Sequence, residues 1–206
     1  YFGIIPRDSI FFLPIDSVRT DILAGHLDMA AVSVARDGLR NISIKIDSRM
    51  PIARWCGNPP SHSFLSTTTP RVAEECYLFD ANGFVYTTIS SSTPVRSFIV
   101  YESLASQATS TSVLGMTLPH ADKFPDAFDF ARQLSLFGSP VTSIVFHDGE
   151  VDQYLESGAR VSYVMGSEQS AFNALASARA NLNFTDDSLE YVDLRFPGKV
   201  YLKRKK

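Results

Sequence analysis

Residues 41–56 read NISIKIDSRMPIARWC, and this stretch organises the fold that we predict for the chain. Ile42, Ile44 and Ile46 alternate with polar residues, which is the period-two pattern of a half-buried strand. Pro51 interrupts the pattern, because a proline cannot donate a hydrogen bond to a strand ladder. We therefore predict a strand, a corner, and a second strand that leads into Cys56, with a domain junction at the corner.

The chain before the corner has the pattern of a small unit. Asp16 or Ser17 can cap a short helix that ends at Gly25, and residues 29–36 alternate like a strand. Asp37-Gly38 is a strong hairpin signal, because both residues tolerate a positive φ. The sequence thus predicts a helix, a strand and a second strand that pairs back on the first.

The chain after the corner has more strand signals. Asp80-Ala81-Asn82-Gly83 separates two short apolar runs and indicates a hairpin. A helix is predicted over 124–137, with an inner face of Ala, Phe and Leu, and Ser167 can cap a second helix. Further strands are expected at 141–146, 153–157, 160–165, 189–196 and 199–203. These elements predict an α+β fold with a mostly antiparallel β-domain and two packed helices.

Cys56 and Cys76 stand in matching contexts, one at the end of an expected strand and one at the start of the next. A cross-strand disulfide is the simplest interpretation and implies an oxidising compartment. It would close a loop of roughly 20 residues and contribute about 3 kcal/mol of stability. The alternative is two buried thiols in a reduced cell. Two lone cysteines lack the paired spacing of zinc sites, so no metal is expected.

Catalytic patterns are weak. Cys56 and His62 could form a thiol nucleophile and its base, but no residue of the sequence is placed to orient the histidine. The sequence has no Gly-rich phosphate loop, no nucleophile elbow and no His-Glu-x-x-His motif. The run 147–150 is acidic, yet it has the composition of a hairpin turn. By elimination we predict a binding module rather than an enzyme, without a cofactor.

The net charge and the residues at the two chain ends limit the classes of partner that we expect. The net charge of -3 does not favour nucleic acid. The basic residues 203–206 could meet anionic lipid or nucleic acid, or form a solvated end that discourages edge pairing. No apolar run approaches the ~20 residues of a membrane helix. Because residue 1 is Tyr and not Met, we expect a piece of a longer protein, with any membrane anchor upstream of Tyr1.

Three motifs taken together resemble one family. The strand at 42–47 leads into Arg49-Met50-Pro51-Ile52-Ala53, and residues 76–86 read CYLFDANGFVY. Near the end, residues 191–196 read YVDLRF and are followed by Lys199-Val200-Tyr201. In this order and spacing they resemble the extracytoplasmic region of the FtsQ/DivIB family of bacterial cell-division proteins.

The resemblance implies a fold and a location. Residues 1–49 would form a truncated POTRA-like domain whose first strand lies upstream of Tyr1, and residues 50–206 an FtsQ-type β-domain. The protein would be a single-pass protein of the cell (inner) membrane, with this region outside the cytoplasm. It would act as a non-enzymatic divisome scaffold for FtsB- and FtsL-like single-pass proteins.

The resemblance also implies functional residues. The partner would add a strand at the C-terminal edge of the β-domain, which corresponds here to Asp193, Arg195, Phe196, Lys199, Val200, Tyr201 and Leu202. Arg49, Pro51 and Ala53 would form the domain junction. Two alternatives remain at this stage: another POTRA-bearing binding module of an envelope secretion or assembly system, and a secreted thiol hydrolase that uses Cys56.

Overall fold

The computed structural model describes residues 12–38, 41–58, 75–89, 98–104, 112–185 and 187–205. The chain divides into two compact units, Tyr1–Met50 and Pro51–Lys206. The described residues form three α-helices and two sheets, so the predicted α+β class is confirmed. The residues of the predicted junction motif span the division between the units.

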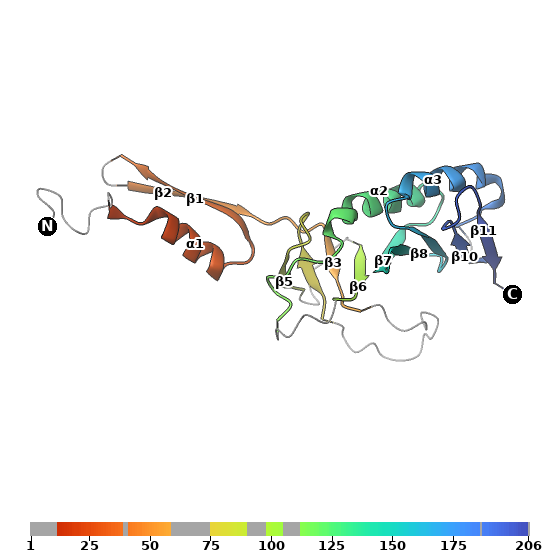
Figure 1. The fold of residues 1–206 in the computed structure, drawn as a ribbon, viewed down its shortest axis with the longest axis horizontal. Coiled ribbons are helices and arrows are strands. Elements are labelled where there is room, and N and C mark those ends of the chain that lie inside the picture. The colour runs from red at the N-terminus through yellow and green to blue at the C-terminus, as the bar shows by residue number, and fades with distance from the viewer. Residues whose placement is uncertain are drawn as a thin grey trace, which may run out of the picture. The chain divides into compact units, whose positions relative to one another are not determined.

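The described residues of the first unit form one helix and one hairpin (Figure 1). Helix α1 (Ile15–Gly25) is followed by β1 (Met29–Asp37) and β2 (Asn41–Ser48), which pair antiparallel. Gly38 has φ 71°, as the predicted hairpin requires. The predicted cap is wrong: the helix already begins at Ile15, so Asp16 lies in its first turn and stabilises the positive end there.

The isoleucine stripe of β2 is exposed. Ile42, Ile44 and Ile46 are 39%, 49% and 46% exposed, although they were predicted to lie on a half-buried face. The reason is that α1 packs mainly on β1, where Val32 is buried, and among the described residues β2 pairs only with β1. The period-two pattern correctly identified the strand but not its burial.

The second unit is built on a nine-stranded mixed sheet in the order β11-β10-β9-β8-β7-β6-β3-β4-β5. Five of its ladders are antiparallel, as predicted, and three are parallel: β3–β6, β6–β7 and β9–β10. The strands are β3 (Ala53–Trp55), β4 (Tyr77–Phe79), β5 (Val85–Thr88), β6 (Ile99–Glu102), β7 (Val141–His147), β8 (Glu150–Leu155), β9 (Arg160–Val164), β10 (Leu189–Asp193) and β11 (Tyr201–Arg204).

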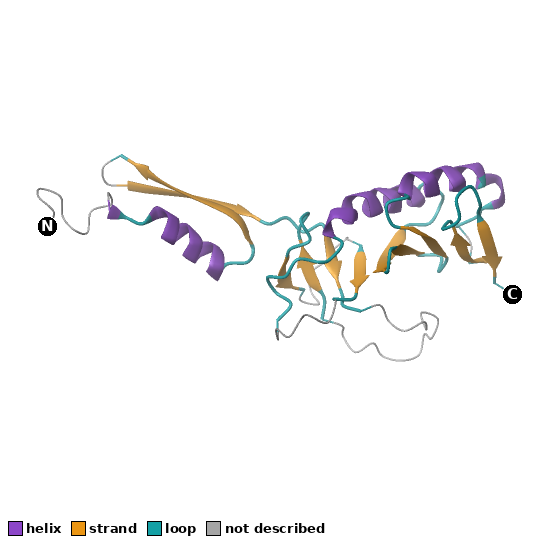
Figure 2. Ribbon diagram, in the orientation of Figure 1, coloured by secondary structure: helices purple, strands orange, loops and turns teal. Residues whose placement is uncertain are grey.

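Two helices, α2 (Phe124–Ser135) and α3 (Glu168–Ser177), run along one face of this sheet (Figure 2). Pro125 lies in the first turn of α2, and Gly138, with φ 115°, follows its end. Short 3-10 helices precede α2 and follow α3, at Ala121–Lys123 (η2) and Arg179–Asn181 (η3). Aromatic side chains fill the space between helices and sheet: Phe130 of α2 packs edge-on against Tyr163 of β9 at 4.7 Å.

The predicted Asp80–Gly83 hairpin forms between β4 and β5. The Asp80 carboxylate accepts hydrogen bonds from the backbone N–H groups of Asn82 and Phe84, at 2.9 and 3.1 Å. Gly83 has φ 73°, and a Cβ atom there would collide with the side chain of Ala121. The Asp-x-x-Gly motif is therefore explained by turn geometry and by close approach of the chain before α2.

The last two predicted strands are shorter than expected. Strand β10 ends at Asp193 instead of residue 196, and β11 begins at Tyr201 instead of residue 199. Pro197 and Gly198 (φ 69°) lie in the turn between them. None of the described helices combines the length and the apolar character needed to cross a bilayer.

Candidate functional site

Strand β11 forms one edge of the large sheet, and within the described residues it pairs only with β10. The Lys205 N–H donates to the carbonyl of Ser188 at 2.8 Å, so it faces the β10 side. Backbone groups of successive strand residues point to opposite sides, so Lys203 and Tyr201 also face β10. The N–H and C=O groups of Leu202 and Arg204 therefore face the open side, where another strand can pair.

Apolar side chains flank this edge. Phe196 and Tyr201 are 51% and 47% exposed, and their rings meet edge-to-face at 5.4 Å. Leu202, which is 37% exposed, lies on the opposite sheet face, because it pairs with buried Val192. Exposed apolar side chains beside unpaired backbone groups provide the contacts that strand addition requires. We call Phe196, Tyr201, Leu202 and the outward backbone of β11 the edge site.

Asp193 and Arg195 are bound to each other at the end of β10, where the Asp193 side chain is largely buried and that of Arg195 is partly exposed. The guanidinium donates from Nε and Nη2 to the two carboxylate oxygens of Asp193, at 3.0 and 2.7 Å, and from Nη1 to Glu150 at 2.8 Å. The hydrogen bonds from Arg195 lower the pKa of Asp193, and the two carboxylates raise the pKa of Arg195. We therefore expect these two residues to shape the edge site by fixing the end of β10 to β8, rather than to contact a partner.

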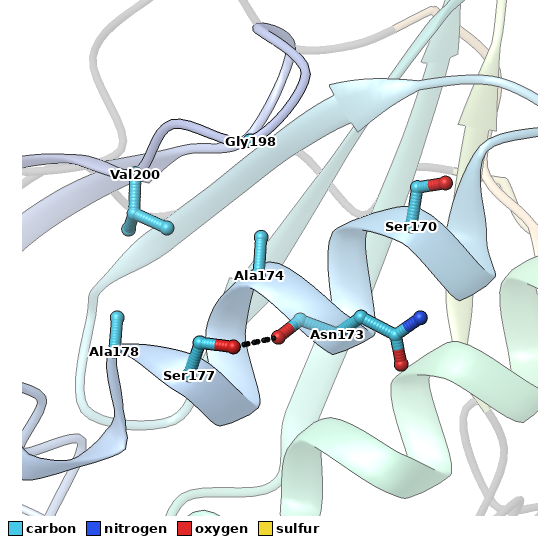
Figure 3. Close-up of a pocket in the computed structure, with 7 residues that line it drawn as sticks. All are labelled: Ser170, Asn173, Ala174, Ser177, Ala178, Gly198 and Val200. Atoms are coloured by element: carbon cyan, nitrogen blue, oxygen red, sulfur yellow. Dashed lines mark hydrogen bonds between the residues drawn. The ribbon is translucent and has the colours of Figure 1, made fainter.

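Lys199 and Val200 precede β11 and differ in their surroundings. Lys199 is exposed, and its backbone N–H closes a turn onto the carbonyl of Phe196 at 3.1 Å. Val200 is half-buried against the main core and lines a groove of ≈470 Å³ beside the edge. Figure 3 shows the side chain of Val200 directed toward α3 across this groove. Val200 thus belongs to the groove wall and not to the strand.

The opposite wall of the groove is a face of α3 that the sequence analysis did not single out. Its residues are small or polar and recur at helical spacing: Ser170, Asn173, Ala174, Ser177 and Ala178. The Ser177 hydroxyl donates to the carbonyl of Asn173 at 2.9 Å, so it is satisfied within the helix (Figure 3). The sequence signal for this groove wall was the recurrence of small residues at helical spacing. Only the fold shows that the turn at Gly198 lies opposite them, so the pattern alone could not predict a groove.

The three junction residues lie in different environments. Arg49 is tied to the first unit, because its Nε donates to the Leu27 carbonyl at 2.9 Å and its backbone N–H to the Asp28 carbonyl at 2.8 Å. Ala53 is fully buried in β3 of the second unit. Pro51 is exposed between them. Arg49 and Ala53 thus fasten each end of the motif to its own unit.

The predicted disulfide between Cys56 and Cys76 is present, with a Cα–Cα distance of 4.3 Å. It joins the end of β3 to the start of β4 and packs with Tyr101 and Val145. Because both sulfurs are bonded, Cys56 is not a free nucleophile in this structure. His62, its suggested base, lies outside the described residues.

Titratable side chains elsewhere in the described residues do not gather into a metal centre. No group of three or more His, Cys, Asp or Glu side chains within the described ranges could hold a metal ion. Residues 147–150 form the tight turn between β7 and β8, where Gly149 has φ 82°, as their composition predicted. The edge site is therefore the candidate that the geometry favours. The sequence matches no protein-family model, and no curated protein matches it either.

Proposed function

We propose that the chain is a non-enzymatic, extracytoplasmic scaffold of the bacterial division machinery, similar to FtsQ/DivIB, that binds FtsB- and FtsL-like single-pass proteins. The partner adds a strand to β11 at the edge site. The observation that carries the proposal is the open backbone of Leu202 and Arg204 beside exposed Phe196 and Tyr201.

Two further observations support the proposal. The three sequence motifs of the resemblance occupy a unit junction, a hairpin turn and the last strands of the sheet, where each has a physical role. The Cys56–Cys76 disulfide suits an oxidising compartment outside the cytoplasm. Strand addition gives affinity through backbone hydrogen bonds, while side-chain contacts give specificity, so a scaffold of this kind needs no catalytic cluster.

The test is binding of purified extracytoplasmic segments of FtsB- and FtsL-like proteins to the immobilised chain. The double variant Phe196→Glu, Tyr201→Glu places two charges on the apolar patch and is expected to weaken binding at least tenfold. Val200 is unsuitable for this test, because a charge there would be half-buried and would disturb the fold.

The control is Leu136→Glu, which places one glutamate charge on an apolar side chain that is 76% exposed beyond α2, and it is matched to the single replacements Phe196→Glu and Tyr201→Glu. We expect this variant to bind like the parent chain. If the double variant and the control bind equally well, the edge site is not the docking surface. If the unmodified chain binds neither segment, the divisome assignment is wrong.

A further inference from the structure

The open edge of the large sheet carries an unbalanced positive charge. Strand β11 and the residues beside it contain the cations Lys199, Lys203, Arg204 and Lys205, although the chain as a whole has a net charge of -3. Among the described residues, only Lys203 of these four has a carboxylate partner, because its Nζ lies 2.7 Å from Glu190. An acidic partner would therefore balance a charge that the fold leaves at this edge.

Arg204 is the cation best placed to contact an added strand. Its backbone faces the open side of β11, and its side chain is exposed. With the described residues its guanidinium makes one hydrogen bond, a long one of 3.4 Å to the Asn181 carbonyl. A guanidinium has five N–H donors, so Arg204 retains accessible donors for a carboxylate.

Alternation along β11 determines which side chains an added strand meets on each face. Leu202 pairs with Val192, which is fully buried in the core beneath the helices, so the side chains of Leu202 and Arg204 lie on the helix-covered face. The groove between α3 and Val200, on the same side of the sheet, is lined by uncharged residues. On this face an added strand thus meets one cation and one apolar side chain, two residues apart.

We propose that the strand which adds to β11 is acidic, with a carboxylate opposite Arg204 and an apolar side chain two residues away, opposite Leu202. The acidic character rests on the strand addition proposed above, and it adds the chemistry that the partner strand must carry. Cross-strand neighbours have Cβ atoms about 4.5–5.5 Å apart, so a glutamate there reaches the guanidinium. The planar guanidinium also suits a carboxylate, which can accept two parallel hydrogen bonds from it.

The same charges argue against a second copy of this chain as the added strand. An antiparallel pair of β11 strands centred on Lys203 would place two lysines directly opposite each other, and opposed like charges are destabilising. In any register a second copy would bring the same set of cations to the edge. The basic edge therefore disfavours self-association and favours an acidic strand.

The experiment measures binding of labelled peptides to the disulfide-intact chain by fluorescence anisotropy. The probe is a seven-residue amidated peptide with a central glutamate, a valine two residues to either side, and threonine elsewhere. Its sequence is the same in both directions, so it presents the acidic and apolar side chains correctly in a parallel or an antiparallel pair. Two control peptides have glutamine or lysine in place of the glutamate. We expect the glutamate peptide to bind about two- to fivefold more tightly than the glutamine peptide, and the lysine peptide to bind most weakly.

A charge reversal in the chain tests the contact with Arg204. Arg204→Glu is expected to reverse the order of affinities, so that the lysine peptide binds most tightly. The matched control is Arg132→Glu, which makes the same charge change on a side chain of α2 that is 62% exposed. This control should keep the original order. Circular dichroism reports whether each variant is folded.

Three results would overturn the acidic preference and leave strand addition standing. The first is equal binding of the glutamate and glutamine peptides to the parent chain, with Leu202→Pro weakening both. The second is an order of affinities that Arg204→Glu leaves unchanged. The third is binding of the FtsB- and FtsL-like segments without saturable binding of the glutamate peptide at millimolar concentration. If Leu202→Pro leaves the binding of all three peptides unchanged, the peptides do not pair with β11, and strand addition itself fails together with the acidic preference.

Discussion

The replacement Leu202→Pro tests strand addition directly, because the Leu202 N–H faces away from β10. Proline removes this donor without removing a hydrogen bond of the β10–β11 ladder. One lost intermolecular hydrogen bond costs about 0.5–1.5 kcal/mol. The proline ring also keeps an added strand from approaching to the usual 4.7–4.9 Å. We therefore expect partner binding to weaken by at least tenfold, since 1.4 kcal/mol corresponds to a factor of ten.

Leu202→Pro should lower the free energy of unfolding only modestly, so the domain stays folded while binding is measured. Leu202 is 37% exposed, so its replacement loses only part of the apolar burial of a leucine, about 1 kcal/mol. By contrast, Lys203→Pro removes a donor that faces β10 and should lower the free energy of unfolding by a further 1 kcal/mol or so. Urea denaturation of each variant measures this difference, and biolayer interferometry with the FtsB- and FtsL-like segments measures binding.

The control for Leu202→Pro is Thr88→Pro on β5, the opposite edge of the same sheet. The N–H of Ile89 donates to the Cys76 carbonyl, so the Thr88 N–H faces the other side and its loss leaves that hydrogen bond intact. This variant should bind like the parent chain. Strand addition at β11 is refuted if Leu202→Pro is folded by urea denaturation and binds both segments with unchanged affinity.

Three further predictions concern stability. Reducing the Cys56–Cys76 disulfide should lower the free energy of unfolding by about 3 kcal/mol, measured by urea denaturation with and without a reductant. Asp193→Asn should lower the free energy of unfolding by about 1–3 kcal/mol, because it breaks the bidentate, charged hydrogen bonding between Asp193 and Arg195. The pKa of Asp193 is lowered from 3.8, so this contribution should be present above about pH 3.8 and be lost as the pH falls through the lowered pKa; the variant should lack that acid-dependent loss in denaturation series. Gly83→Ala should lower the melting temperature, because the new Cβ meets Ala121 and φ is positive; an unchanged melting temperature would contradict this account of the Asp80–Gly83 turn.

Local chemistry in the sequence was sufficient for several parts of the fold. Asp37-Gly38 and Asp80–Gly83 specify their hairpins, because the residues that tolerate the turn conformations are next to each other in the chain. The alternation at 42–46 identified a strand, because successive strand side chains point to opposite faces. Pro125 marked the start of α2, whereas the helix ends at Ser135, two residues earlier than the predicted end at 137. The disulfide was the simpler of two interpretations, since Cys56 ends one predicted strand and Cys76 begins the next, and the structure contains it.

The candidate sites depended on pairings between distant residues, which no local pattern specifies. The parallel ladders β3–β6, β6–β7 and β9–β10 join segments separated by long connections, and they determine which strands become edges. Only this order shows that the backbone of Leu202 is open, that Arg195 is bound to Glu150, and that Arg204 lies at an open edge. The sequence by itself determined the α+β class, the turns and the presence of a last strand, although that strand begins two residues later than predicted. Only the tertiary structure decided which side chains are exposed and which charged residues pair. Both depend on residues that are distant in the sequence but adjacent in the fold.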